Sequence, residues 1–236
     1  MHLLAIDTAT RRVGVAIGCE SGLLGSIELG GAGTEGPPRH AEQLAPAIEY
    51  LCAETRVSLE QIAAIAVGVG PGMFTGLRVG VTTAKVLAQA LRVPVISVPS
   101  LDLIAYPLRH ASALVVPVVD ARRHEVYYAI YRPLPGGLQR VSEYELATAD
   151  DVAAELQSRG EEAIVAGDGA ARFRSIFSEL DRVELAGPSY AVPSLSALVE
   201  LAAGCYEREQ FVPASEVVPM YLRRSDAEIA WERRGA

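Results

Sequence analysis

An acidic residue and two hydroxyl residues stand near the start of the chain, in Asp7-Thr8-Ala9-Thr10. A carboxylate and hydroxyl groups at the end of a strand can hold a phosphate-bound Mg²⁺ ion and donate hydrogen bonds to phosphate oxygens. A second acidic turn, Asp120-Ala121-Arg122-Arg123, places a carboxylate beside cations. These turns make Asp7, Thr8, Thr10, Asp120 and Arg122 candidates for a nucleotide cleft. The alternative is that Asp7 closes an Asx turn and that the second turn carries a surface ion pair of little energetic weight.

A glycine-rich segment spans residues 70–80 and reads Gly-Pro-Gly-Met-Phe-Thr-Gly-Leu-Arg-Val-Gly. It follows an uncharged apolar run and opens a helical pattern, which is where backbone N–H groups bind anions. Gly70 and Gly72 therefore join the candidates for the nucleotide cleft. The segment is not a P-loop, because it lacks the Gly-Lys-Ser/Thr ending, and it does not match the dinucleotide-binding fingerprint.

Small residues recur at every fourth position of the helix that follows: Gly76, Gly80, Ala84 and Ala88. An interior glycine costs about 1 kcal/mol relative to alanine in a helix. A row kept at that cost predicts that another helix packs very closely on this face. The neighbouring helix belongs either to this chain or to a partner.

Several other kinds of site have no support in the sequence. The cysteines (Cys19, Cys52, Cys205) and the histidines (His2, His40, His110, His124) are isolated, without the spacing of a metal site or a hydrolytic centre. The net charge of −8 disfavours unaided RNA binding, and the arginines of residues 223–234 alternate with carboxylates as on a solvated surface. No apolar run approaches the ~18 residues of a membrane span, and the start does not resemble a signal peptide. We expect a cytoplasmic protein with reduced thiols, no metal and no membrane contact.

The elements that would position these residues follow from hydrophobic periodicity. Strands are predicted at residues 3–7, 13–18, 23–29, 62–69, 93–98, 114–120, 125–131, 138–146 and 162–166, and helices at residues 40–55, 74–91, 148–159, 169–180 and 193–209. Pro46 predicts a kink or a late start in the first helix. The uncharged strand before the glycine segment is typical of a strand buried on both faces.

The chain contains a weak internal repeat. Asp7 and Asp120 each end an apolar strand, and each is followed at the same spacing by a valine and an isoleucine. Two similar α/β lobes that face each other would bring both acidic turns to the mouth of one cleft. We predict a first lobe at residues 1–104, a second lobe at 105–210, and a tail at 211–236 that packs back on the first lobe.

The quoted residues resemble the TsaB (YeaZ) family over nearly the whole chain. The resemblance rests on Ile6-Asp7-Thr8, His40-Ala41-Glu42-Gln43-Leu44, residues 67–80, residues 96–101, Val119-Asp120-Ala121-Arg122 with Glu125-Val126-Tyr127, and Pro219-Met220-Tyr221-Leu222-Arg223. Its most specific part is Gly-Pro-Gly-x-Phe-Thr-Gly-x-Arg-x-Gly. It implies a two-lobed, actin-like (ribonuclease H-like) ATPase-type α/β fold with duplicated mixed-sheet lobes, as in actin, Hsp70 and sugar kinases.

The resemblance also implies a function in making threonylcarbamoyladenosine beside the tRNA anticodon. In that pathway a TsaD-type paralogue carries the metal and transfers the threonylcarbamoyl group, and a TsaE-type ATPase joins the complex. Ser100 and Ile104 stand where the paralogue has its metal-binding histidines, which implies that this chain is a non-catalytic subunit. Ala9 replaces a glycine of nucleotide-binding relatives, so we expect no tightly bound cofactor, with ATP or ADP at most at the subunit boundary. Contact with tRNA would be indirect.

We predict that two helices meet the paralogue, or form a homodimer in its absence. The predicted contact residues are His40, Leu44, Ile48, Leu51, Phe74, Thr75, Gly76, Gly80, Ala84 and Ala88. On this hypothesis Gly80→Leu abolishes partner binding and leaves the fold intact. The rival functions are a stand-alone small-molecule kinase that uses Asp7 and Asp120, and a peptidase.

Overall fold

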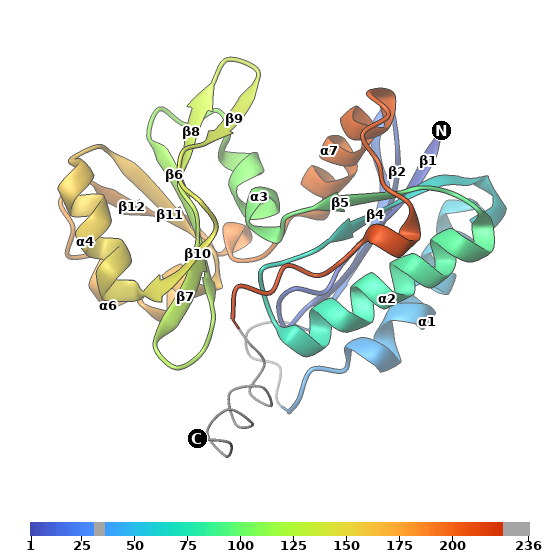
Figure 1. Cartoon of the computed structure of the whole chain (residues 1–236), viewed down its shortest axis with the longest axis horizontal. Helices are drawn as coiled ribbons and strands as arrows, with labels where there is room; N and C mark the ends of the chain where they lie inside the picture. Colours follow the sequence, from blue (N-terminus) through green and yellow to red (C-terminus); the bar gives the residue numbers. More distant parts are fainter. Residues whose placement is uncertain (31–35, 224–236) are drawn as a thin grey trace.

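The computed structural model describes residues 1–30 and 36–223. Its first lobe is a five-stranded sheet of order β3-β2-β1-β4-β5, in which β1, β2 and β3 are antiparallel and β1, β4 and β5 are parallel. The elements are β1 (His2–Asp7), β2 (Val13–Cys19), β3 (Gly22–Leu29), α1 (His40–Thr55), η1 (Leu59–Gln61), β4 (Ile62–Gly68), α2 (Phe74–Leu91) and β5 (Val95–Val98). Figure 1 shows α1 and α2 side by side against this sheet.

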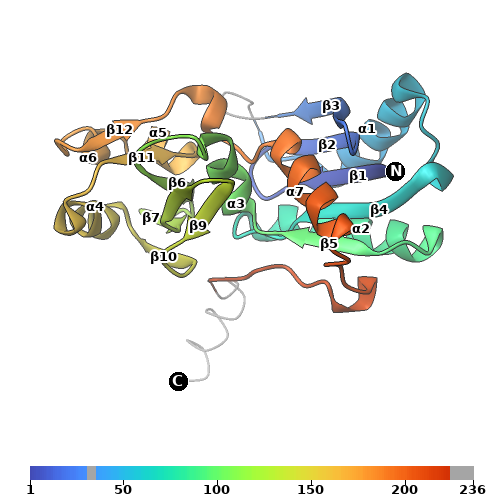
Figure 2. The same cartoon turned by 90° about the horizontal axis from the view of Figure 1, so that it is seen from above.

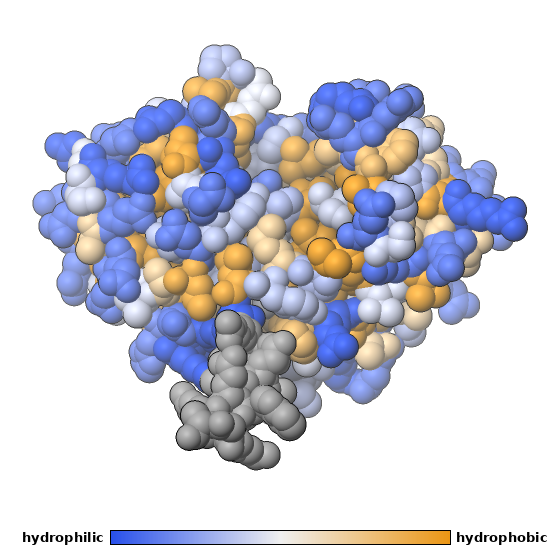
Figure 3. Space-filling view, in the orientation of Figure 1, coloured by the Kyte–Doolittle hydropathy of each residue, from blue (hydrophilic) through white to orange (hydrophobic). Residues whose placement is uncertain are grey.

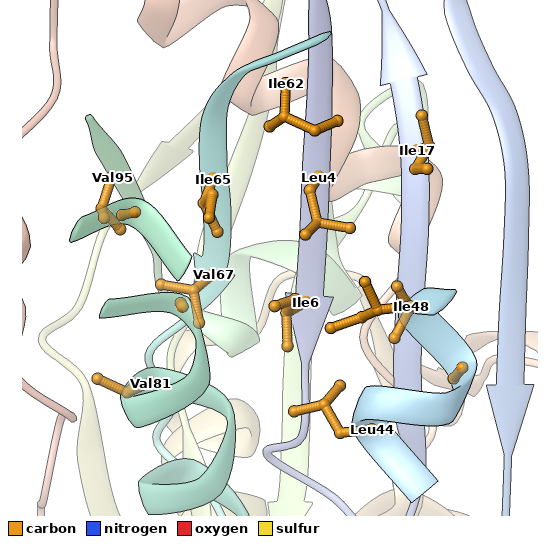
Figure 4. Packing of buried hydrophobic residues seen from close by; sticks show 14 of the residues in the cluster. Leu4, Ile6, Ile17, Leu44, Ile48, Ile62, Ile65, Val67, Val81 and Val95 are labelled. Atoms are coloured by element: carbon orange, nitrogen blue, oxygen red, sulfur yellow. The ribbon is translucent and has the colours of Figure 1, made fainter. Parts of the chain in front are cut away.

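The core of the first lobe lies between the sheet and these two helices. Figure 4 shows Leu4 and Ile6 of β1 and Val67 of β4 meeting Leu44, Ile48 and Val81 of the helices. Strands β1 and β4 are almost entirely buried because α7 (Leu195–Glu207) covers the opposite face of the sheet, as Figure 2 shows. This cover explains why the two central strands carry uncharged apolar runs instead of an alternating pattern.

The second lobe repeats the order of the first. Its sheet runs β10-β7-β6-β11-β12, with β6 antiparallel to β7 and parallel to β11, and the hairpin β8–β9 pairs with β6. Its elements are β6 (Leu114–Asp120), β7 (Glu125–Tyr128), β8 (Tyr131–Leu134), β9 (Gly137–Arg140), β10 (Glu145–Thr148), α4 (Ala149–Arg159), β11 (Ala163–Ala166), α5 (Asp168–Arg172), α6 (Arg174–Phe177), β12 (Val183–Leu185) and η3 (Pro188–Tyr190). Because β6 takes the place of β1 and ends at Asp120 as β1 ends at Asp7, the structure has the predicted duplicated lobes.

Two connections differ from the domain boundaries that we expected. Helix α7 falls within the predicted second lobe, yet its buried side chains pack on the first sheet. Helix α3 (Ser100–Ala105), which continues into η2 (Tyr106–Leu108), was not predicted, and it contributes Leu101 and Ile104 to the core of the second lobe. An apolar helix can cover either sheet, and which sheet it covers depends on the path of the chain rather than on its own pattern.

The described part of the tail lies along the first lobe and then reaches the second. Val212 pairs with Val95 of β5, and Lys85 of α2 donates hydrogen bonds to the carbonyl of Ser215 within η4 (Ala214–Glu216) and to that of Val217 just after it. Further on, Leu222 packs in the core of the second lobe, and Arg223 pairs with Glu125. The predicted tail residues 224–236 lie outside the described residues.

Individual elements also depart from the predictions. Helix α1 begins at His40 and continues through Pro46, so it has no late start. The predicted strand at 125–131 is divided into β7 and β8, and the one at 138–146 into β9 and β10, because the chain crosses from one strand pair to another. The predicted helix at 169–180 is two short helices, α5 and α6. Within the described residues no helix is both long and apolar enough to cross a bilayer.

Candidate functional site

The carboxylate of Asp7 lies inside the first lobe, at the end of β1. Its Oδ1 accepts a hydrogen bond from the Ala9 N–H at 3.1 Å, and its Oδ2 accepts one from Ser100 Oγ at 2.9 Å. The side chain is buried, and burial raises the pKa of Asp7 to about 6, although the two hydrogen bonds act in the opposite direction. The bond to Ala9 is the Asx turn that was the alternative reading of this segment.

The two threonines that follow are also occupied by the chain itself. Thr8 is fully buried and donates its hydroxyl hydrogen to the Gly76 carbonyl at 2.8 Å. Thr10 Oγ1 accepts from the Arg12 N–H, and the Thr10 carbonyl is hydrogen-bonded to His40 Nε2 at 2.8 Å. In this arrangement the hydroxyl of Thr8 serves the fold and is not presented to a ligand.

The small-residue row of α2 faces the chain's own first turn rather than a partner. A Cβ atom on Gly76 would overlap the Thr8 carbonyl, and one on Gly80 would overlap Thr8 Oγ1. Ala84 and Ala88 are buried in the core cluster that includes β1 and α1. The expectation that these four residues form an exposed contact face is therefore wrong for the chain as described, since close approach inside the lobe accounts for them.

The predicted contact residues of α1 are likewise interior. Leu44, Ile48 and Leu51 belong to the core under the first sheet, and His40 is buried against Thr10. They cannot form an exposed surface, because the helix turns this face to its own sheet. Of the ten predicted contact residues, only Phe74 and Thr75 are exposed.

The glycine loop after β4 is closed by backbone contacts. Met73 N–H donates to the Ala9 carbonyl at 2.7 Å, and a Cβ on Gly72 would overlap that carbonyl. Gly70 N–H donates to Ser100 Oγ at 3.1 Å, and the Gly70 carbonyl accepts from the Ser100 N–H. The loop thus packs on the Asp7 turn and on the start of α3, and these N–H groups are already used.

The second acidic turn is more exposed and is rich in cations. Asp120 Oδ1 accepts from the Arg122 N–H at 2.9 Å, and Oδ2 accepts from Arg172 Nη1 at 2.7 Å. Asp168, at the start of α5, accepts from the Asp120 N–H at 2.9 Å, and burial raises the pKa of Asp168 to about 6. Arg122, Arg123 and His124 all have left-handed backbone angles, which are uncommon for residues other than glycine.

A cleft of about 270 Å³ lies between the lobes beside these turns. The first lobe contributes Thr10, Arg11 and Arg12 to its wall. The second lobe contributes Gly167, Asp168, Arg174 and an apolar wall of Ala170, Ala171, Leu185, Ala186, Pro188, Ala191 and Val192. Of the predicted cleft residues, Thr10 lines this cleft and Asp7 lines a small cavity that shares Thr10 and Arg12 with it.

Sequence reasoning missed Arg12, Ser100 and Asp168 as members of this region. Arg12 Nε is buried without a hydrogen-bond partner, whereas Arg12 Nη1 pairs with Glu28. Asp168 follows β11 and stands between two glycines, so the sequence did contain a signal like the one at Asp7. Ser100 carried no signal for its contact with Asp7, because the two residues are far apart in the sequence.

The side chains that could bind a metal ion do not form a metal site in the part of the chain that the structure describes. No group of three or more His, Cys, Asp or Glu side chains is gathered there. Ser100 Oγ already bonds Asp7 and Gly70, and Ile104 is buried in the apolar core of the second lobe.

Comparison with known proteins gives one consistent result. Residues 35–231 match the family model described as TsaD, tRNA N6-adenosine threonylcarbamoyltransferase. The chain is 28% identical to the tRNA threonylcarbamoyladenosine biosynthesis protein TsaB of Bacillus subtilis over 233 residues, 98% of each chain. It is also 28% identical to the Escherichia coli protein of the same name, over 99% of this chain and 98% of that one. The solved structure of YeaZ from Pseudomonas aeruginosa superposes with a TM-score of 0.74 at 30% identity, covering 94% of this chain and 99% of that one.

Proposed function

Because the chain belongs to the TsaB (YeaZ) family, we propose that it takes part in tRNA threonylcarbamoyladenosine biosynthesis. In this proposal it is a non-catalytic partner subunit that binds and supports a TsaD-type paralogue. Matches along nearly the full length of both TsaB relatives support the pathway. The non-catalytic part is supported by Ser100 and Ile104, which by the family resemblance stand where the paralogue has its metal-binding histidines. A buried isoleucine cannot bind a metal ion, and Ser100 Oγ is used within the fold.

The exposed side of α2 is the surface that we assign to the paralogue. Phe74, Arg78, Thr82 and Val86 stand four residues apart on this side, and Val86 is 60% exposed. The tail extends the stripe, because the Tyr221 ring lies 4.8 Å from the Phe74 ring. Figure 3 shows apolar surface where the tail crosses α2. Exposed aromatic and aliphatic side chains beside an arginine are typical of protein contact surfaces.

The remaining parts of the proposal concern other components of the complex. ATP or ADP would bind at the boundary between this chain and the paralogue rather than within this chain, because Thr8 and the Gly70–Gly72 loop are already engaged. A TsaE-type ATPase would join the two subunits, and a homodimer would use the same α2 stripe when the paralogue is absent. The net charge of −8 supports only indirect contact with tRNA.

The first test is size-exclusion chromatography with light scattering on this chain mixed with the TsaD-type paralogue of its source organism. A new peak at the summed mass supports the subunit proposal. Two unshifted peaks, with and without ATP, overturn it. Mg-ATP binding by the isolated chain, with turnover lost in Asp7→Ala, would establish the rival kinase function.

A substitution on the stripe tests the assigned surface. Val86→Glu places a charge on it without touching the core, so we expect the summed-mass peak to disappear while the fold persists. Leu134→Glu is the matched control, because Leu134 is an exposed aliphatic residue on the other lobe. The assignment is contradicted if both variants lose binding to the same extent, or if neither variant loses it.

A further inference from the structure

A second interlobe cavity lies in the notch between the β8–β9 hairpin and α7 (Figures 1 and 3). It has a volume of about 350 Å³, which falls in the range of about 300–1,000 Å³ that is typical of small-molecule sites. None of its lining residues lines the cleft beside Arg12. The residues that carry its charge are Asp102 on α3, Glu200 on α7, Arg140 on the hairpin, and Arg208 just past α7.

The acidic side of this cavity is held in position by tyrosines. Tyr131 and Tyr144 both donate hydroxyl hydrogens to Asp102 Oδ1, at 2.6 and 2.8 Å. Asp102 Oδ2 accepts no hydrogen bond from the described residues, and it is not among the buried unpartnered atoms, so it is open to solvent in the cavity. Glu200 Oε1 accepts from Tyr106 at 2.9 Å, and Glu200 also forms an ion pair with Arg109, whose Nη2 lies 3.2 Å from Oε1.

The basic side is positioned by stacking and by local hydrogen bonds. The Arg140 guanidinium lies 4.2 Å from the centre of the Tyr144 ring, and its Nη1 donates to the Ser142 carbonyl and to Glu143 Oε2. Arg208 Nε donates to Gln210 at 3.0 Å, and its two Nη atoms have no hydrogen-bond partner among the described residues. Each guanidinium therefore keeps N–H donors available for an anion.

The cavity thus offers two carboxylates and two guanidinium groups on walls that belong to both lobes. Glu200 is already ion-paired with Arg109 and Arg140 with Glu143, whereas Asp102 and Arg208 have no ion-pair partner among the described residues. A small molecule that carries both charges can meet Asp102 and Arg208 at once. Leu138 and Leu201 provide the apolar part of the wall. We propose that this notch binds a small zwitterion of the α-amino-acid class, with its ammonium group at Asp102 and Glu200 and its carboxylate at Arg140 and Arg208.

The glycines of the cavity allow it to be filled without disturbing the core. A Cβ on Gly137 would meet nothing within 4 Å, and one on Gly204 would meet only the flexible guanidinium of Arg208. Gly204 is inside α7, so a larger residue also improves helix propensity. Gly204→Leu should therefore fold and occupy the site. Gly187→Leu is the matched control, since a Cβ on Gly187 would meet nothing within 4 Å and Gly187 lines the other cleft.

The experiment is isothermal titration calorimetry of the full chain at neutral pH with the standard L-amino acids, one at a time. We expect at least one of them to bind, and its C-terminal amide and N-acetyl derivatives to bind at least about tenfold more weakly, because each lacks one charge. Failure of every amino acid to bind overturns the proposal. So does equal affinity for the amide or the acetyl derivative, since only one half of the site would then be used.

Three variants test whether the amino acid binds in this cavity. Gly204→Leu and Arg208→Ala should each weaken the binding of that amino acid by about tenfold or more, and Gly187→Leu should leave it unchanged. Circular dichroism melts of each variant establish that it is folded. Unchanged affinity in folded Gly204→Leu, or equal loss in folded Gly187→Leu, would show that the ligand binds elsewhere and overturn the proposal.

Discussion

Asp7 and Asp168 are two carboxylates that the fold holds in partly or fully buried positions. Burial raises the pKa of each to about 6, from a usual value near 3.8. The folded state therefore binds a proton at these sites more readily than the unfolded state does. Such a group stabilises the fold fully below its unfolded pKa, and this contribution is lost as the pH rises through the folded pKa.

Asp7→Asn should remove the contribution of Asp7 to this dependence, because Asn keeps the acceptor for the Ala9 N–H but does not ionise. The free energy of unfolding of the variant, relative to wild type, should rise by about 2 kcal/mol between pH 4 and pH 7. Urea denaturation across this range measures it. The exposed Glu42→Gln is the control, and a difference between variant and wild type that does not change with pH would contradict the assignment.

Asp168→Asn tests the second carboxylate independently. Asn retains an oxygen to accept from the Asp120 N–H, so the geometry of the turn should persist. The sign is the same as for Asp7: the variant should gain stability relative to wild type as the pH rises through about 6. Combined with Asp7→Asn, it should give a flatter pH profile than either single variant. A profile as steep as that of wild type in the double variant would rule out both carboxylates as the source.

At the scale of the element, α2 has two faces with different tasks. Gly76 and Gly80 lie against Thr8, and Ala84 and Ala88 are buried in the core of the lobe, while the stripe from Phe74 to Val86 is exposed. The small-residue row is therefore needed for α2 to pack inside the first lobe. The stripe carries the side chains that remain available to a partner, and the ordered tail adds Tyr221 to it.

The two faces should respond differently to substitution. Gly80→Ala should destabilise the fold by about 1–3 kcal/mol, because its Cβ overlaps Thr8 Oγ1, and Gly80→Leu should prevent folding. Val86→Glu should leave the denaturation midpoint unchanged. Chemical denaturation followed by circular dichroism compares the three. A stably folded Gly80→Leu would restore the original prediction that this row is a contact face.

At the scale of the whole molecule, two sets of contacts link the second lobe to the connecting helix α3 and to the tail. In the first set, Tyr131 and Tyr144 of the second lobe hold Asp102 of α3. In the second set, the tail crosses from α2 to the second lobe, where Arg223 donates to the Ala121 carbonyl and pairs with Glu125. Both contacts are at least partly buried, so they bear on how the lobes are held relative to each other.

Arg223→Met should loosen the second of these connections. It leaves the Ala121 carbonyl and the Glu125 carboxylate without this partner, so amide hydrogen exchange in residues 121–125 should become faster. Exchange in α1 should not change, because that helix has its own core. Unaltered exchange in the turn would show that the tail contact does not restrain it.

Local patterns predicted much of the fold. The periodicity of residues 40–55 and 74–91 predicted α1 and α2 with correct bounds, because an apolar stripe repeats with the helical period. The uncharged run at β4 indicated a strand buried on both faces, and the repeated aspartates indicated two lobes. The resemblance carried by residues 67–80 and the flanking motifs led to the family that the comparisons support.

Only the tertiary structure decided which face of each helix is buried and which distant residues meet. The row at Gly76 and Gly80 specifies a close approach but does not name its neighbour, and the neighbour is Thr8 of the same chain. Ser100 reaches Asp7 across more than ninety positions, and α7 returns to the first sheet after the second lobe is complete. Sequence periodicity records how much surface an element must bury, whereas the partner that buries it is set by the path of the whole chain.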